Sequence, residues 1–133
     1  MIRPDELMDA LPEADVVIMT AALNEENHHI VNERFINAMK SGATFVNIGR
    51  GGLVDERALL QGLDAGKPAL AILDVFEEEP LPESSPFWSH PRVRLTAHCA
   101  GASPGTSLRG DEQFLANLRR YLDGEPLQMT VTL

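Results

Sequence analysis

Short apolar runs alternate with amphipathic stretches along most of this chain, and the alternation predicts a sheet with helices between its strands. Four runs are rich in valine, isoleucine and leucine and lack the regular polar alternation of a half-exposed strand. We expect each run to form a strand that is buried on both faces, as in a parallel α/β sheet. The four predicted strands span residues 15–20, 44–49, 69–75 and 93–97.

The stretches around these runs carry the start and stop signals of helices. Asn32 and Asp55 each precede a helical pattern and are favourable N-cap residues, whereas Gly42 and Gly66 follow the expected C-terminal ends. Right-handed crossovers between parallel strands then predict an α/β fold in three layers, with helices on both faces of the sheet. The predicted helices cover residues 4–11, 33–39, 56–65 and about 106–123.

The connection between the third and fourth strands, residues 76–92, is the exception to this regular pattern. A loop of this length without regular structure is uncommon in a compact domain and is usually functional or disordered. Its sequence, FEEEPLPESSPFWSHPR, contains four prolines and three aromatic residues besides its acidic run. This composition predicts a loop that packs against the domain.

Composition limits the class of protein. The chain has 133 residues, of which 44% are hydrophobic and 23% charged, which is typical of a folded globular domain. A net charge of −9 argues against nucleic acid as a partner, and no apolar run approaches the roughly 20 residues of a membrane span. The single cysteine, Cys99, excludes an internal disulfide and predicts a cytoplasmic location.

Chemically distinctive residues follow the predicted strands. In open parallel sheets, ligands bind outside the carboxyl ends of the strands. Arg50 follows the second strand, Asp74 lies at the end of the third with Glu79 soon after it, and His98 follows the fourth. If the strands are parallel, these four side chains gather at one edge of the sheet.

Each of these residues also has a simpler interpretation. Arg50 fits a solvated turn, Glu79 belongs to an exposed acidic run, and His98 fits a core histidine bonded to the backbone. Asp74 is harder to explain in this way, because a carboxylate at the end of an apolar strand is costly to bury without a partner. The occurrence of all four at one edge favours a functional site.

Such a set suits one kind of chemistry. A histidine gives or takes a proton near neutral pH, a neighbouring carboxylate orients its ring, and a guanidinium matches a carboxylate with a planar pair of donors. Together these groups suit the reversible reduction of a 2-oxo acid by a hydride from a nicotinamide cofactor.

Two long segments carry a resemblance to a known family. The segments NIGRGGLVDERALLQGLDAGKPALAILDVFEEEPLP and SPFWSHPRVRLTAHCAG resemble the D-isomer-specific 2-hydroxyacid dehydrogenases, which include glyoxylate/hydroxypyruvate reductases and phosphoglycerate dehydrogenases. The likeness extends from about Ala14 to the C-terminus. It implies that Arg50 binds the carboxylate and C2 oxygen of the substrate, that Glu79 is the glutamate of the D-V-F-x-x-E-P motif, and that His98 donates the proton.

The resemblance also implies a cofactor, NAD or NADP, and a small 2-oxo or 2-hydroxy acid substrate. The positions that match the family's nicotinamide-side contacts are Ala21, Ile48, Gly49, Arg50, Asp74, His98, Cys99, Ala100 and Gly101. In this interpretation the glycines around Arg50 let the backbone approach both ligands closely.

Some positions depart from the family's pattern. Ala22 and Ala97 occupy positions that are usually proline, and His28 stands where arginine is frequent. Cys99 beside the histidine suggests a nucleophilic thiol as an alternative, but its position is ordinarily apolar. We expect no metal site at His28 and His29, because no further ligand is suitably spaced.

The chain lacks the first half of a dinucleotide-binding domain. It contains no G-x-G-x-x-G turn and no acidic residue about 20 positions after one, and the substrate-binding domain is absent. We therefore interpret residues 1–133 as the second half of an NAD(P)-binding domain, inactive in isolation. The alternative is a non-catalytic remnant or interaction module that keeps the same half of the fold.

The missing half affects how the strands are expected to pair. If residues 15–20 and 44–49 are the third and fourth strands of the order 3-2-1-4-5-6, two absent strands lie between them. They then either pair directly or leave open edges, and open edges promote association. A homo-oligomer, or a partner that supplies the missing strands, is expected.

Overall fold

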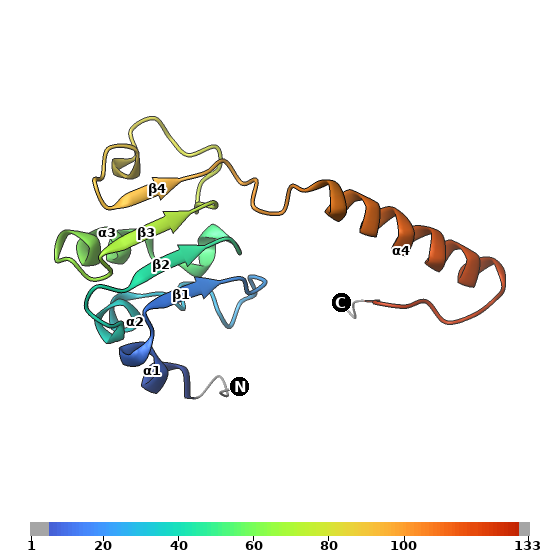
Figure 1. The fold of residues 1–133 in the computed structure, drawn as a ribbon, viewed down its shortest axis with the longest axis horizontal. Helices are drawn as coiled ribbons and strands as arrows, with labels where there is room; N and C mark the ends of the chain where they lie inside the picture. The colour runs from blue at the N-terminus through green and yellow to red at the C-terminus, as the bar shows by residue number, and fades with distance from the viewer. Residues whose placement is uncertain (1–5, 131–133) are drawn as a thin grey trace. The chain divides into compact units, whose positions relative to one another are not determined.

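The structure, a computed structural model, describes residues 6–130 of the chain. These residues form two compact units, with the division between Ala100 and Gly101 (Figure 1). The first unit holds the sheet together with Arg50, Asp74, Glu79 and His98, and the second holds one long helix.

The first unit contains the predicted four-stranded parallel sheet, in the order β1-β2-β3-β4 (Figure 1). Each strand is shorter than predicted. All four predicted strands are present: β1 Val16–Met19, β2 Thr44–Asn47, β3 Leu70–Leu73 and β4 Val93–Leu95.

Strands β1 and β2 pair directly, with Val16 opposite Thr44 and Met19 opposite Asn47. Of the two alternatives for the missing strands, direct pairing therefore holds. Direct pairing agrees with the numbering of β1 as the third strand of the 3-2-1-4-5-6 order when the two strands between β1 and β2 are absent. If β1 is instead the fourth strand, the next two strands are its consecutive neighbours, as observed.

The helices begin largely where their capping residues predict. Asn32 accepts a hydrogen bond from the Phe35 amide at the start of α2 (Glu33–Ala38), and Asp55 accepts one from Ala58 at the start of α3 (Glu56–Asp64). The expected first helix is shorter, since α1 covers Leu7–Ala10 and continues as a 3₁₀ turn, η2 Leu11–Glu13. Residues 4 and 5 of that prediction lie outside the described residues.

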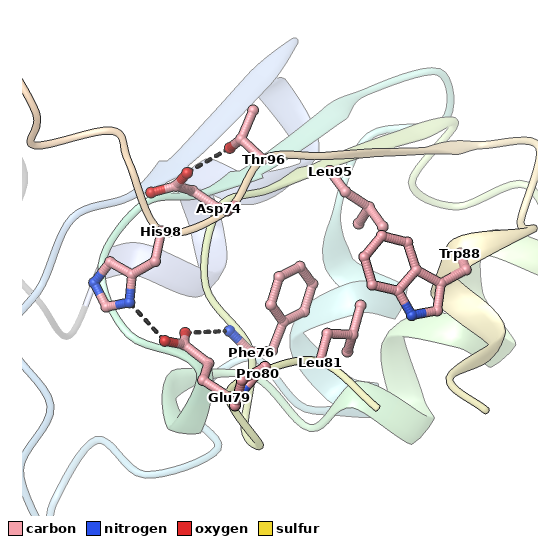
Figure 2. Close-up of a pocket in the computed structure, with 10 residues that line it drawn as sticks. Asp74, Phe76, Glu79, Pro80, Leu81, Trp88, Leu95, Thr96 and His98 are labelled. Atoms are coloured by element: carbon pink, nitrogen blue, oxygen red, sulfur yellow. Dashed lines mark hydrogen bonds and ion pairs between the residues drawn. The ribbon is translucent and has the colours of Figure 1, made fainter. Parts of the chain in front are cut away.

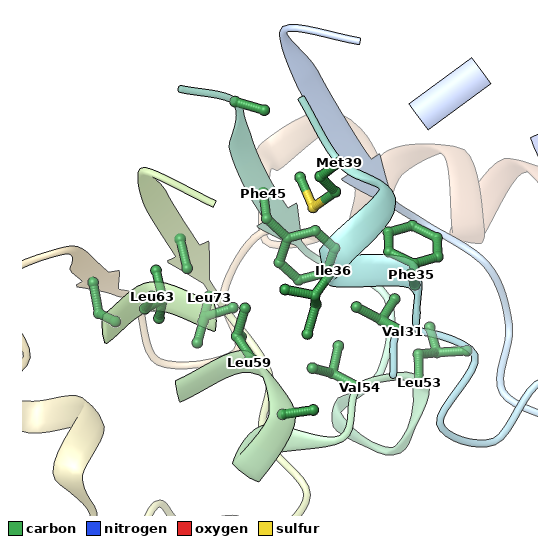
Figure 3. Close-up of a cluster of buried hydrophobic side chains, with 14 of the residues drawn as sticks. Val31, Phe35, Ile36, Met39, Phe45, Leu53, Val54, Leu59, Leu63 and Leu73 are labelled. Carbon is green, nitrogen blue, oxygen red and sulfur yellow. The ribbon is translucent and has the colours of Figure 1, made fainter. Parts of the chain in front are cut away.

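One face of the sheet carries the core of the first unit. Phe45 on β2 and Leu73 on β3 point toward Ile36 of α2 and Leu59 of α3 (Figure 3). The opposite face is different, because Ile18 on β1 is 57% exposed and its neighbour Val46 is half-buried. Within residues 6–100, the predicted second layer of helices is not found.

The direction of the crossovers explains this one-sided packing. From β1 to β3, each crossover helix leads to the next strand on the same side. Right-handed crossovers that all advance in one direction place their helices on the same face of the sheet, and only a reversal of direction fills the other face. The sequence pattern alone does not contain this direction, so it predicted helices on both faces.

The second unit consists of α4, Pro104–Leu122, and the segment that follows it. Ser103 caps the helix by accepting a hydrogen bond from the Thr106 amide at 3.2 Å. Asn117 exchanges two hydrogen bonds with the backbone of Gln128, so the following segment folds back along the helix. Among the described residues, no helix is long and apolar enough to cross a membrane.

Candidate active site

Asn47, the last residue of β2, holds the turn that carries Arg50 through two side-chain hydrogen bonds. The Asn47 side chain donates to the Arg50 carbonyl oxygen at 3.0 Å and accepts from the Gly49 amide at 3.1 Å. A Cβ atom on Gly49 would lie 2.9 Å from the Ala21 carbonyl oxygen, so a side chain there would push two loops apart. The turn thus exposes the guanidinium of Arg50 on a rigid base, with one hydrogen bond from Nη1 to the Gly49 carbonyl.

Gly51 brings this turn against the long loop of residues 76–92. It is buried at the start of η3 (Gly51–Leu53), and a Cβ atom there would overlap the backbone of Phe76 and Glu77. The loop itself is ordered by a further 3₁₀ turn, η4 Pro86–Trp88, and by the buried side chain of Phe87. The prediction of a packed loop is therefore confirmed.

Glu79 and His98 form a hydrogen-bonded pair at the carboxyl edge of the sheet (Figure 2). The His98 Nδ1 atom lies 2.6 Å from one carboxylate oxygen of Glu79, and the other oxygen accepts from the Phe76 amide at 2.9 Å. The predicted contact between these two residues is confirmed. Because Nδ1 is engaged, the Nε2 atom is the nitrogen that remains for a ligand.

The environment of Glu79 favours its charged form. The hydrogen bond from His98 lowers the pKa of Glu79, with the Phe76 amide and the nearby charge of Arg50 acting in the same direction. Partial burial opposes these effects without cancelling them. The carboxylate is therefore ionised at neutral pH and can hold the imidazole in one orientation.

A pH titration of Glu79 tests this arrangement. The carboxyl group of Glu79, observed by carbon NMR, is expected to titrate below the ordinary glutamate value of about 4.3. Since the folded pKa is the lower one, the interaction stabilises the loop above the unfolded pKa and is lost as pH falls through the folded pKa. His98→Asn should move the titration back toward the ordinary value. His90→Asn, at the other end of β4, is the matched control and should not move it.

Asp74 is buried, with only 2% of its surface exposed, and its carboxylate faces the turn that carries His98. It accepts the amides of Cys99 at 2.9 Å and Ala100 at 2.8 Å, together with the hydroxyl of Thr96. Burial raises the pKa of Asp74, but the hydrogen bonds from Thr96, Ala100 and Cys99 together outweigh it and lower the pKa. The partners expected for this buried carboxylate are therefore groups of the same chain, namely two backbone amides and one hydroxyl.

Two cavities at this edge collect most of the residues singled out in the sequence. One, of about 480 Å³, is lined by residues from the ends of β1 and β2 that include Ala21, Ile48, Gly49 and Arg50. The other, of about 570 Å³, is lined by Asp74, Glu79 and His98 together with an apolar wall. Cys99 and Ala100 bind Asp74 through their amides, and Gly101 belongs to the second unit.

Several site residues were not singled out in the sequence. Asn47 and Thr96 each form a hydrogen bond that holds a turn at the carboxyl edge of the sheet. Leu81, Trp88 and Leu95 form the apolar wall of the larger of the two cavities (Figure 2). A polar residue at the end of an apolar strand was the available signal for Asn47 and Thr96. The packing of the long loop against β4, which creates the wall, has no local signal.

The histidine pair on the loop after β1 has a structural explanation. The rings of His28 and His29 stack with centroids 3.9 Å apart, and His29 is paired with Glu77. Within residues 6–130, no group of three or more histidine, cysteine, aspartate or glutamate side chains is arranged to hold a metal ion.

A parallel sheet with one-sided crossover helices and these groups at its carboxyl edge defines part of a Rossmann-like dinucleotide-binding domain. Residues 1–100 match the family described as D-isomer specific 2-hydroxyacid dehydrogenase, NAD binding domain, and the chain belongs to this family.

Individual relatives agree with this assignment. Glyoxylate/hydroxypyruvate reductase B of Klebsiella pneumoniae (strain 342) is 44% identical over 119 residues, which is 90% of this chain and 37% of the relative. The crystal structure of a D-isomer specific 2-hydroxyacid dehydrogenase from Xanthobacter autotrophicus Py2, in complex with NADPH and MES, is similar with a TM-score of 0.89 and 35% identity. That match covers 97% of this chain and 41% of the other.

A third relative is the NADPH-dependent glyoxylate/hydroxypyruvate reductase from Sinorhizobium meliloti, in complex with NADP and sulfate. Its TM-score is 0.89 at 30% identity, and the match covers 98% of this chain and 42% of the other. The chain therefore spans about two-fifths of the length of the relatives that it matches.

Proposed function

We propose that this chain carries the catalytic side of an NAD(P)-dependent enzyme that interconverts 2-oxo acids and D-2-hydroxy acids. The observation that carries the proposal is the His98–Glu79 pair, 2.6 Å apart at the carboxyl edge of a parallel sheet, beside the exposed Arg50. Glyoxylate and hydroxypyruvate are the first substrates to test, because the relatives are named for them.

In this proposal each side chain has a separate task. Arg50 binds the substrate's carboxylate and the C2 oxygen through its planar guanidinium. His98, with Nδ1 fixed on Glu79, gives a proton to the C2 oxygen from Nε2 during reduction and takes it back during oxidation. Glu79 orients the imidazole and stabilises its charged form.

The nicotinamide end of the cofactor fits the smaller cavity. Ala21, Ala22 and Gly49 line it with little side-chain volume, which leaves room for a flat ring beside Arg50. The bound cofactor supplies the hydride. Ile48 and Gly49 also line this smaller cavity. Asp74, Cys99, Ala100 and Gly101 remain predicted contacts on the side of His98. The sequence offers no glycine-rich turn for the pyrophosphate, so the fit is limited to the nicotinamide side.

The proposal includes a partner and a location. The sheet face that no helix of residues 6–100 covers, and the edge of β1 that has no partner strand among the described residues, favour association with a second copy or with a chain that supplies the remaining strands. We place the protein in the cytoplasm, because the exposed thiol of Cys99 suits a reducing compartment.

A second candidate function is that of a non-catalytic remnant or interaction module. It is favoured by the exposed apolar side chains on the sheet face opposite the core, where Ile18 is 57% exposed. A chimera separates the two candidates, in which this chain replaces the segment that it matches in the Klebsiella pneumoniae reductase. NADPH-dependent reduction of glyoxylate or hydroxypyruvate by the chimera supports the enzyme, and a folded chimera without turnover supports the module.

The isolated chain is expected to bind NADPH with a dissociation constant in the millimolar range or weaker. The sequence contains no motif that would bind the pyrophosphate and adenosine of the cofactor. Each lost hydrogen bond to a phosphate costs on the order of 1 kcal/mol or more. Size-exclusion chromatography should show self-association, because the apolar sheet face and the β1 edge are uncovered. Calorimetry that gave micromolar binding by a monomer would contradict both expectations.

A further inference from the structure

The backbone of His98 has an unusual conformation. Its φ angle is +49°, in the left-handed region that residues other than glycine seldom adopt. Such a conformation persists only where the surrounding structure fixes it from several sides, and it often marks a functional position. The direction of the imidazole therefore depends on whatever holds the turn of residues 96–100.

Asp74 makes most of the hydrogen bonds that hold this turn. Its carbonyl oxygen accepts the His98 amide at 2.8 Å, and its carboxylate oxygens accept the amides of Cys99 and Ala100. Three consecutive amides thus converge on one residue. The carboxylate must itself keep a fixed orientation for these bonds to fix the turn.

Thr96 provides that orientation. Its hydroxyl donates to the same carboxylate oxygen that receives the Cys99 amide (Figure 2). The Thr96 amide donates to the Leu73 carbonyl at 3.0 Å, so the backbone of Thr96 continues the ladder between β3 and β4. The hydroxyl is therefore attached to the sheet, whereas the amides of Cys99 and Ala100 belong to the turn.

We propose that Thr96 is a positioning residue that fixes the Asp74 carboxylate, and through it the turn that aims the His98 imidazole at Glu79. Asp74 connects the sheet to the turn through its hydrogen bonds, and the hydrogen bond from Thr96 sets the orientation of the Asp74 carboxylate. The position before His98 carries Ala97, which restricts the backbone less than proline does, so the hydrogen bonds carry more of the constraint. The consequence for catalysis rests on the proposed role of His98, but the effect on geometry does not.

The test compares two substitutions at Thr96 in the full chain. Thr96→Val keeps the shape and removes the donor, whereas Thr96→Ser keeps the donor. Nitrogen NMR of the His98 ring reports whether Nδ1 still bonds Glu79, and amide hydrogen exchange reports the turn. In Thr96→Val we expect the amides of Cys99 and Ala100 to exchange about tenfold faster or more, in line with the loss of a hydrogen bond to a charged group. The Nδ1 signal of His98 should also shift.

In Thr96→Ser, the exchange rates of the Cys99 and Ala100 amides should stay within about twofold of those in the original chain, because the donor is kept. The Nδ1 signal of His98 should stay at its original position. Thr44→Val on β2 is the matched control, since it makes the same exchange on another strand of the sheet, and it should leave His98 unchanged. Unaltered His98 signals in Thr96→Val, or no restoration by serine, would overturn the proposal.

A general loss of stability is distinguished from a positioning role by the strand amides. If Thr96→Val and Thr96→Ala both lose the protection of β3 while Thr96→Ser keeps it, the hydroxyl supports the whole fold and the proposal is overturned. In the active chimera, Thr96→Val should lower kcat about tenfold with a smaller rise in the KM for NADPH, because the contacts around Arg50 remain whereas those predicted at Cys99 and Ala100 loosen. A chimera without any turnover would count against the proposed function and leave the NMR result intact.

Discussion

Replacing His98 by alanine is expected to lower turnover by about 10²–10⁴-fold in a chimera completed by the Klebsiella pneumoniae reductase, the range typical of a lost general acid or base. In the proposed mechanism, the substitution removes the group that transfers the proton to and from the C2 oxygen. Arg50 and the small residues of the cavity proposed for the nicotinamide are unchanged, so the affinity for NADPH should change much less. Steady-state kinetics with hydroxypyruvate and a separate binding measurement resolve the two effects.

The matched control for this experiment is His90→Ala. His90 lies before β4 and is paired with Asp64, at the end of the strand opposite to His98. Its removal should leave the chemical step in place. Full turnover by the His98→Ala chimera would show that the proton comes from another group, and Cys99 would then be the next side chain to test.

Gly51→Ala is expected to lower the free energy of unfolding of the first unit by about 1–3 kcal/mol or more, the cost typical of overpacking a well-packed interior. The added Cβ atom would overlap the backbone of Phe76 and Glu77, so no side-chain rotation can relieve the clash. The Arg50 turn and the loop carrying Glu79 must separate. The single tryptophan, Trp88, lies in the first unit, and its fluorescence during urea denaturation measures the change.

Gly110→Ala provides the comparison. Gly110 lies in α4 with nothing within 4 Å of a Cβ atom, so the same chemical change meets open space. Alanine is the better helix former by roughly 0.5–1 kcal/mol, and this variant should not lower the stability reported by Trp88. Equal unfolding midpoints for Gly51→Ala and the original chain would mean that the two loops do not need their close contact.

Close backbone contacts explain two of the three glycines around Arg50. Gly49 lets the turn approach Ala21, and Gly51 lets it approach Phe76, so Arg50 is carried into the space between the ends of β1 and β3. The charge of Arg50 then acts on Glu79 and helps to keep that carboxylate ionised. The glycines are therefore required by packing, and the exposed guanidinium is the result.

The local elements and the residues at their ends follow from the sequence alone. Apolar runs specify strands and capping residues specify helix starts because both depend on neighbours along the chain, as at Asn32 and Asp55. Parallel strands bring their carboxyl ends to one edge, so the encounter of Glu79 with His98 also followed from the sequence. The resemblance to the dehydrogenases supplied the roles that the geometry alone does not assign.

The tertiary structure decided what depends on direction and on distant contacts. Crossovers that all advance one way place the helices of residues 6–100 on one face of the sheet, and no local pattern encodes that direction. The same holds for the carboxylate of Asp74, whose partners at Thr96, Cys99 and Ala100 are more than 20 positions away along the chain. The position of Asp74 at the end of an apolar strand indicates that a buried carboxylate needs hydrogen-bond partners. Only the folded chain determines which groups come within hydrogen-bonding distance of it.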